Sequence, residues 1–495
     1  MSDEKKALIT TISSIIYQIV SVISGFILPK LMLEKYGSEV NGLITTITQY
    51  ITIISLLDMG VGAVVQSSLY KPLVNNDIEE ISKIVNSGKK FFRNLGRILI
   101  VYIIVLSFVF PKIVNVNIDN SIIVILIFIL SLNYFAQYFF GIINKVIITA
   151  SQKGYIVYIT QSIALIINTI ACYLLVVHNY NIISVKLITS ISFIVQPIIY
   201  YLYVRKNYKI DNTIKYTEEP IKQKWNAVAQ HVSAVVLENS DVIMLSSFSD
   251  MLNVSIYSVY SMVTKGVRQL FVSFTGGLSS YFGNLWANNN KNSFSKKWFF
   301  IEWIMHNLTV LLFIITAITI MPFITIYTIK LNDANYINPL FGLMMTLAMS
   351  LYCFRLIYSI TIQAVGHYRQ TQNNYVIAIV INLLVSFVSV NRYGLIGVTF
   401  GTIAALFYQT IWMRNYIKVN IMQNQSSNML KALFIDTLFC IIMYLLQNVF
   451  NTTVANYTEW FGFALINGII SVVVLTLLNI LFNREMIRKC FNKEM

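Results

Sequence analysis

The sequence predicts an all-α polytopic membrane protein with about fourteen transmembrane helices. Three observations lead to this class: 56% of the 495 residues are hydrophobic, only 12% are charged, and the mean hydropathy is +0.67. A soluble domain carries roughly a quarter charged residues. The chain is therefore too apolar for an ordinary soluble protein of its length.

Apolar stretches define the predicted spans, since a spanning helix needs roughly 20 mostly apolar residues. The first stretch is too long for the apolar region of a signal peptide, and no small-residue cleavage site follows it. The predicted helices are 7–33, 40–68, 91–111, 120–144, 155–178, 183–204, 225–248, 253–287, 298–329, 337–364, 372–390, 394–416, 431–450 and 460–482.

One further helix is predicted outside the spans. Asp77 with Glu80 forms a capping box at the start of 77–85, where apolar residues follow at helical spacing. We expect this segment to lie as a short amphipathic helix on the inner membrane face.

The distribution of Lys and Arg predicts the orientation. Of the 36 basic residues, 27 lie on one side, in the two tails, the even-numbered connections and the adjoining helix ends; six lie in or beside the odd-numbered connections, and three lie well inside helices. Positive charge accumulates on the cytoplasmic side, so both termini are predicted to be cytoplasmic at the cell membrane. The net charge of +15 is thus a topology signal, which favours contact with membrane lipids over nucleic acid.

An internal repeat divides the predicted helices. Three pairs of segments keep their order at a nearly constant offset: 39–43 with 251–255, 89–92 with 296–300, and 150–168 with 364–382. The pattern predicts two parallel six-helix lobes, 1–206 and 207–420, and two C-terminal helices within 421–495. Transporters are often built from such repeats, with the substrate site between the halves.

No motif for catalysis is visible. The sequence has no P-loop and no HExxH, its four His and four Cys are scattered, and its loops are too short for a catalytic domain. We therefore expect no enzyme activity, no cofactor and no metal, and a monomeric protein.

Ionisable residues inside the spans predict the site, because burying a charge in a membrane is costly. The strongest cluster joins Glu238 and Asp241 to Lys265 and Arg268, on either side of a hairpin that places Glu238 and Lys265 at similar depth. Two readings stay open. The cluster is a self-neutralising salt bridge, or it lines a water-filled cavity in which Arg268 and Arg355 attract an anion such as phosphate.

Polar stripes and further charged positions complete the candidates. Such stripes in lipid face protein or water, so they predict either a polar cavity or close helix packing. Tyr257 and Tyr260 fit sugar stacking or an interfacial belt. Asp58, with Glu238 and Asp241, keeps an ion-coupled mechanism open. Charged groups near the cytoplasmic ends fit interface exposure or function: Glu302, His306 and Asp436. The stripes contain Tyr17 with Thr10, Ser14, Ser21 and Ser24; Thr45, Thr48, Thr52 and Ser55; and Ser261 with Ser258, Lys265, Arg268 and Thr275.

Three long stretches carry a resemblance to a known family. The runs at 35–69 (KYGSEVNGLITTITQY and onward), 241–263 and 364–406 resemble the oligosaccharide flippases, the Wzx-type polysaccharide transporters. These belong to the multidrug/oligosaccharidyl-lipid/polysaccharide exporter superfamily. The resemblance implies a MATE-like, two-lobed transporter that works by alternating access. Its expected substrate is an undecaprenyl-pyrophosphate-linked oligosaccharide for capsule, exopolysaccharide, O-antigen or teichoic acid.

The resemblance also implies roles for residues and partners. Arg268, Lys265 and Arg355 would attract the pyrophosphate, while the stripes containing Tyr17 and Ser261 would accommodate sugar. The range 431–482 would form the lipid-tail groove found in lipid II flippases. Those relatives also have several arginines in the N-lobe cavity, and this chain has none in the middle of helices 1–6. A polysaccharide polymerase and glycosyltransferases are the expected partners. Two rival hypotheses are a cation-coupled drug antiporter of the same superfamily and a membrane scaffold for polysaccharide assembly.

Overall fold

The computed structural model contains helices joined by short connections, with no strand in the residues that it describes. The described residues are 3–54, 61–114, 116–214, 228–275, 278–287, 291–367, 369–422, 429–449, 454–484 and 486. They fall into two compact units, residues 1–255 and 256–495. The predicted division into six, six and two helices stays a prediction.

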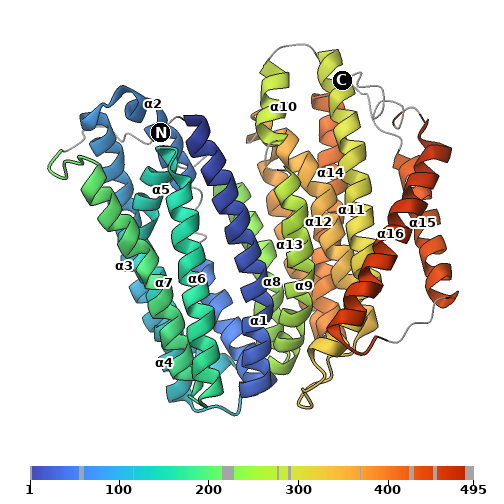
Figure 1. Cartoon of the computed structure of the whole chain (residues 1–495), viewed down its shortest axis with the longest axis horizontal. Helices are drawn as coiled ribbons and strands as arrows, with labels where there is room; N and C mark the ends of the chain where they lie inside the picture. The colour runs from blue at the N-terminus through green and yellow to red at the C-terminus, as the bar shows by residue number, and fades with distance from the viewer. Residues whose placement is uncertain are drawn as a thin grey trace. The chain divides into compact units, whose positions relative to one another are not determined.

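The first unit holds eight α-helices and a π-helical turn among its described residues, together with the first residues of α9 (Figure 1). Within it, α1 packs along α6, and α4 packs against α7. The elements are α1 (Asp3–Thr52), α2 (Val61–Asn75), α3 (Ile78–Ile113), α4 (Asn120–Ala136), the π turn (Gln137–Gly141), α5 (Ile142–Ala150), α6 (Gly154–Val177), α7 (Ile182–Asn207) and α8 (Val228–Phe248).

The second unit contains the remaining helices. In Figure 1 α15 and α16 lie at its edge, where α16 packs on both α15 and α11. The elements are α9 (Met251–Thr275), α10 (Leu278–Ala287), α11 (Lys291–Tyr327), α12 (Pro339–Ala364), a 3-10 turn (Arg369–Thr371), α13 (Gln372–Tyr393), α14 (Leu395–Asn420), α15 (Met429–Val449) and α16 (Tyr457–Phe482).

The helices confirm the predicted fold class, with corrections to individual spans. Eleven helices in the described part of the chain are long and apolar enough to cross a membrane, so the number fourteen is not confirmed. The predicted spans 7–33 and 40–68 meet in α1, which breaks at Gly37 because φ is 80° there. Glycine adopts this backbone conformation without a steric penalty.

Two other elements differ from prediction. Asp77 does cap a helix, since its carboxylate accepts a hydrogen bond from the backbone N–H of Glu80 at 3.0 Å. However, the predicted separate amphipathic helix is wrong: 77–85 leads directly into the long α3, and Ile84 and Val85 are buried. The predicted span 253–287 is divided in the structure into α9 and α10.

A tight contact in the first unit joins α1 to the start of α9. A Cβ atom added at Gly42 would lie 2.0 Å from the carbonyl oxygen of Met251. Next to it, the Asn41 amide donates a hydrogen bond to the Ser255 hydroxyl at 2.9 Å. Only glycine at residue 42 permits this close backbone approach, as small residues do at many helix interfaces in membranes.

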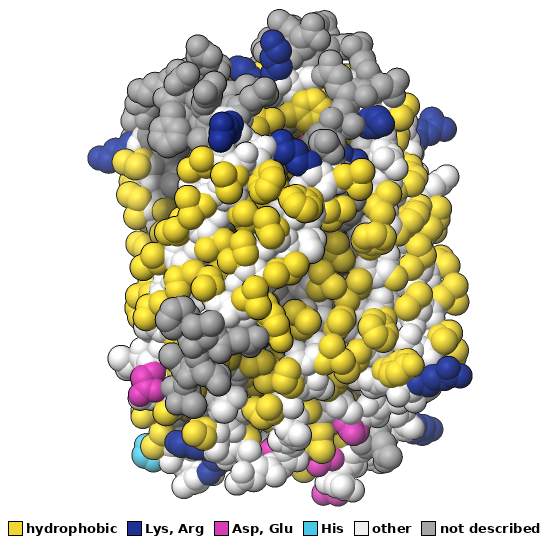
Figure 2. All heavy atoms as spheres, turned by 90° about the vertical axis from the view of Figure 1, so that its right-hand side faces the viewer, with side chains coloured by type: hydrophobic (Ala, Val, Ile, Leu, Met, Phe, Trp, Pro, Cys, Tyr) yellow, Lys and Arg dark blue, Asp and Glu magenta, His cyan; other side chains and the backbone are white. Residues whose placement is uncertain are grey.

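The second unit has an extensive apolar surface that can contact lipid. Large apolar side chains on α16 recur about one turn apart and are exposed: Leu465, Ile469, Val473 and Leu477. Figure 2 shows hydrophobic side chains over much of this face, with Lys and Arg side chains near its upper end. An exposed apolar surface of this extent fits a bilayer rather than water.

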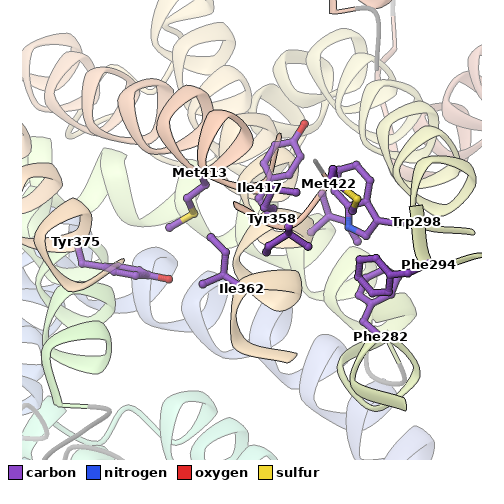
Figure 3. Close-up of a cluster of buried hydrophobic side chains, with 11 residues drawn as sticks. Phe282, Phe294, Trp298, Tyr358, Ile362, Tyr375, Met413, Ile417 and Met422 are labelled. Atoms are coloured by element: carbon purple, nitrogen blue, oxygen red, sulfur yellow. The ribbon is translucent and has the colours of Figure 1, made fainter. Parts of the chain in front are cut away.

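Buried aromatic residues hold the second unit together near the start of α11. Phe282, Phe294 and Trp298 gather with Tyr358 from α12 (Figure 3). The indole of Trp298 donates a hydrogen bond to the Thr361 hydroxyl at 2.8 Å. These contacts fix α10, α11 and α12 against one another and so fix which faces of α12 remain for other neighbours.

Candidate functional site

Arg355 is the most unusual charged residue in the second unit. It lies on α12 and is 6% exposed. Its guanidinium donates one hydrogen bond, from Nη1 to the Gln409 side-chain oxygen on α14 at 3.2 Å. Arg355 forms no ion pair with any residue that the structure describes, and its Nε has no hydrogen-bond partner there. A buried cation with no carboxylate is costly and therefore marks a candidate anion site.

Tyr352 brings a second arginine to the same place. The guanidinium carbon of Arg355 lies 5.0 Å from the centroid of the Tyr352 ring, and that of Arg268 lies 4.5 Å from it. Cation–π contacts of this kind stabilise each guanidinium by about 0.5–2 kcal/mol. They do not neutralise charge, so the ring leaves the positive charge of Arg355 without a compensating carboxylate in the described residues.

Helix α9 supplies the other candidates of this unit. Ser261, Lys265 and Arg268 follow each other at intervals of four and three residues, so they share one helical face. Ser261 is buried, while Lys265 and Arg268 are half-buried. The face therefore runs from a buried hydroxyl to the two cations.

The predicted acidic partners lie in the first unit. On α8, Asp241 is 3% exposed and Glu238 is exposed. Pairing of Glu238 with Lys265 would link residues of the two units and stays a prediction. Asp58 lies outside the described residues.

The polar stripe of α1 packs against α6. The Tyr17 ring lies 6.0 Å from that of Tyr158, and the hydroxyl of Ser24 accepts a hydrogen bond from Thr169 at 2.9 Å. The α1 hydroxyls farther along, including Thr48 and Thr52, donate to their own helix backbone four residues earlier. Close helix packing thus explains part of each stripe, and the sugar role of Tyr17 stays a prediction.

A neutral polar group on α1 and α4 was not predicted. The hydroxyls of Thr52 and Tyr134 are hydrogen-bonded at 3.0 Å. One turn before Thr52 and one residue before Tyr134, the side-chain oxygens of Gln49 and Asn133 are buried and have no hydrogen-bond partner within the described ranges. These four side chains offer amide and hydroxyl groups without charge.

The structure contradicts both roles predicted for Tyr257 and Tyr260 on α9, which were sugar stacking and a place in an interfacial belt. Tyr260 is fully buried, its hydroxyl donates to the Tyr336 carbonyl at 2.7 Å, and its ring meets Phe341 at 4.8 Å. Tyr257 is also buried and lies near Phe341. Neither ring is at an interface or available for stacking on sugar, because both form the core between α9 and α12.

The charged groups that the sequence predicts near the cytoplasmic ends take part in contacts within the second unit. Glu302 is 7% exposed and accepts a hydrogen bond from the Tyr358 hydroxyl at 2.9 Å. His306 on α11 and Asp436 on α15 lie 2.9 Å apart. Simple interface exposure therefore does not explain them.

Solved structures share this fold. The chain is similar to a lipid II flippase, MurJ, in an inward closed conformation, with a TM-score of 0.73 at 16% identity over 97% of this chain and 100% of that one. It also resembles an inward-facing multidrug-resistance MATE transporter of the MOP superfamily, with a TM-score of 0.64 at 13% identity over 85% and 100%.

A third similar structure is a MOP-superfamily transporter from Pyrococcus furiosus, with a TM-score of 0.59 at 14% identity over 85% of this chain and 97% of that one. No protein-family model matches the sequence, and no curated protein matches it either. The chain thus has the fold of MOP-superfamily transporters. At these identities the likeness establishes the fold alone.

Proposed function

We propose that the chain is a flippase that moves an undecaprenyl-pyrophosphate-linked oligosaccharide from the inner to the outer leaflet for a surface polysaccharide. The observation that carries this proposal is the pair of guanidiniums at Tyr352. Arg355 is buried with no carboxylate among its described neighbours, and Arg268 lies at the same ring. A pyrophosphate would supply the missing negative charge, and guanidinium groups bind phosphate oxygens with two parallel hydrogen bonds.

The first unit, taken by itself, holds a neutral polar group of the kind that hydrogen-bonds sugar hydroxyls. Gln49, Thr52, Asn133 and Tyr134 provide donors and acceptors without a net charge. Sugar hydroxyls need such groups, because a buried hydroxyl without a partner costs about 1–3 kcal/mol. The MurJ and MATE structures support a transporter, and MurJ is named as a lipid II flippase.

Surface polysaccharide on intact cells tests the proposal. Arg355→Ala and Arg268→Ala should each reduce export about ten- to a hundredfold, because a charge-assisted hydrogen bond contributes about 1.5–3 kcal/mol. Arg392→Ala is the matched control, since Arg392 is exposed at the end of α13. Protein levels are compared by immunoblot. Normal export in both variants at normal protein level would show that the arginines are not the site.

A cation-coupled antiporter is the second candidate, favoured by one observation. Asp241 is a carboxylate that is 3% exposed on a helix of the first unit. Buried carboxylates in membranes serve as proton or Na⁺ sites in many transporters. A deletion strain that is sensitive to drugs but has intact surface polysaccharide would favour this alternative, and Asp241→Asn should then remove drug resistance.

A further inference from the structure

A second, separate cavity lies inside the second unit. It has a volume of about 750 Å³ and is bounded by α11, α12, α14, α15 and α16. Two of the helices around it are joined by hydrogen bonds, from the Trp303 indole on α11 to Asn479 on α16 at 3.1 Å and from Asn479 to Asn307 on α11 at 2.7 Å. Phe439 of α15 is fully buried in the adjoining apolar cluster.

Helix α12 contributes different residues to this cavity and to the arginine site. Leu351, Phe354 and Tyr358 line the cavity and recur at intervals of three and four residues, so they form one helical face. Tyr352 and Arg355 lie on the neighbouring face, where they meet Arg268 and Gln409. Neither Tyr352 nor Arg355 lines the cavity, so the cavity and the arginine site are formed by different residues of the same helix.

The charges of the lining are unequal. Four basic side chains from four different segments line the cavity: Lys296, Arg414, Lys431 and Arg484. Against them stand two carboxylates, of which Asp436 contacts His306 and Glu302 accepts from Tyr358. Lys296 and Arg484 form no ion pair within the part of the chain that the structure describes. The lining thus has an excess of positive charge.

Much of the remaining lining is apolar, and part of it is exposed on the surface of the protein. Phe407, Leu433 and Leu481 line the cavity and are also exposed. In Figure 2 a group of Lys and Arg side chains lies near the upper end of this face, above hydrophobic side chains, and others lie near its lower end. The distribution of basic residues predicts that the upper end faces the cytoplasm, at the depth of lipid headgroups. An occupant can therefore place a charged end among the cations and apolar chains along the bilayer.

We propose that this cavity binds the phosphodiester headgroup of an anionic glycerophospholipid from the inner leaflet. The headgroup contacts Lys296, Arg414, Lys431 and Arg484, and the acyl chains lie against Phe407, Leu433 and Leu481. A zwitterionic headgroup would bring its own cation into this basic lining, so it binds more weakly. The site holds a bilayer lipid rather than the transported substrate, because neither arginine of the pair lines it.

Lipid titration of the purified full-length chain tests the proposal. Dioleoylphosphatidylglycerol and dioleoylphosphatidylcholine are added separately to delipidated protein, and bound lipid is measured by native mass spectrometry. The double variant Lys296→Gln/Arg484→Gln should bind phosphatidylglycerol about thirtyfold more weakly than the unmodified chain, since each basic residue contributes about fivefold to binding of anionic lipid. Phosphatidylcholine binding should change less than about twofold.

The matched control removes the same charge outside the cavity. Arg369→Gln/Lys418→Gln changes two basic residues that do not line it, and phosphatidylglycerol affinity should stay within about threefold. Equal losses in the two double variants, or equal binding of the two lipids by the unmodified chain, would overturn the proposal. If the first double variant aggregates, Lys296→Gln alone should bind phosphatidylglycerol about fivefold more weakly than the unmodified chain. Unchanged affinity in this single variant would also overturn the proposal.

A competition arm distinguishes the two sources of a phosphate headgroup. Undecaprenyl pyrophosphate is added to protein saturated with phosphatidylglycerol. Retention of the phospholipid supports the proposal. If undecaprenyl pyrophosphate displaces the phospholipid at a concentration lower than phosphatidylglycerol needs to saturate the protein, the cavity belongs to the transported lipid. That result would contradict the proposal.

Discussion

Arg355 and Gln409 can be replaced together by apolar residues of similar volume, which separates stability from transport. The arginine is 6% exposed and the glutamine is fully buried. Their hydrogen bond at 3.2 Å leaves the Arg355 Nε and the Gln409 amide nitrogen without partners in the described structure. We predict that Arg355→Met/Gln409→Leu is more stable than the unmodified chain and inactive in transport.

The magnitude follows from the contacts. A charged arginine at the centre of a membrane helix costs about 3 kcal/mol. Stacking on Tyr352 offsets about 1 kcal/mol, and the bond to Gln409 offsets about 1–1.5 kcal/mol. Each buried polar atom without a partner adds about 1 kcal/mol or more. Removal of both side chains should therefore increase the free energy of unfolding by about 1–3 kcal/mol, as found when apolar residues replace buried charges elsewhere.

Arg355→Met alone should behave differently. It leaves the Gln409 side chain buried with neither of its polar atoms bonded, so it should be about 1–2 kcal/mol less stable than the double variant. Arg392→Met, on the exposed end of α13, is the control and should change stability by less than about 0.5 kcal/mol.

Thermal unfolding in one detergent, followed by intrinsic fluorescence, measures the stability differences. Export of surface polysaccharide measures transport in the same variants. A double variant that is less stable by about 2 kcal/mol or more would show that the pair is structural. A double variant with full transport would refute the assignment of Arg355 to the anion site, whatever its stability.

Two contacts give further predictions. Gly42→Val should destabilise the first unit by about 1–3 kcal/mol, because the new side chain overlaps the Met251 carbonyl. Gly25→Val is the control and should have little effect in the same unfolding assay, because no atom lies within 4 Å of a Cβ added there. Asp436→Ala should remove the contact with His306 and raise hydrogen exchange in α15 about tenfold, and unchanged exchange would show that the apolar cluster alone holds α15.

The sequence was sufficient for the class of fold because the apolar runs are long and the bilayer permits little other than helices. It could not place every break. The helix α1 changes direction at Gly37, although the residues on both sides of it are helical. This kink depends on the φ angle of a single residue. The segment 77–85 has a real cap but continues into α3, within which Gly88 packs closely against Ile143.

The candidate site was predictable only in its charged members. Arg268 and Arg355 are conspicuous because a cation in an apolar run is rare. Tyr352 and Gln409 were missed, since tyrosine and glutamine are unexceptional until the packing of α9, α12 and α14 brings them to the arginines. Tyr260 was misjudged for the reverse reason: its hydroxyl suggested a polar role, whereas the structure buries it against backbone carbonyls.

Transbilayer movement of a defined lipid tests the central claim most directly. Undecaprenyl pyrophosphate with one labelled sugar is placed in the outer leaflet of proteoliposomes, and loss of accessibility to a membrane-impermeant sugar oxidant is followed. We predict movement with the unmodified chain and with Arg392→Ala, and at least tenfold slower movement with Arg355→Ala, as expected from loss of about 1.4 kcal/mol or more. Equal rates with the Arg355 variant, or no movement with the unmodified chain, would contradict the account.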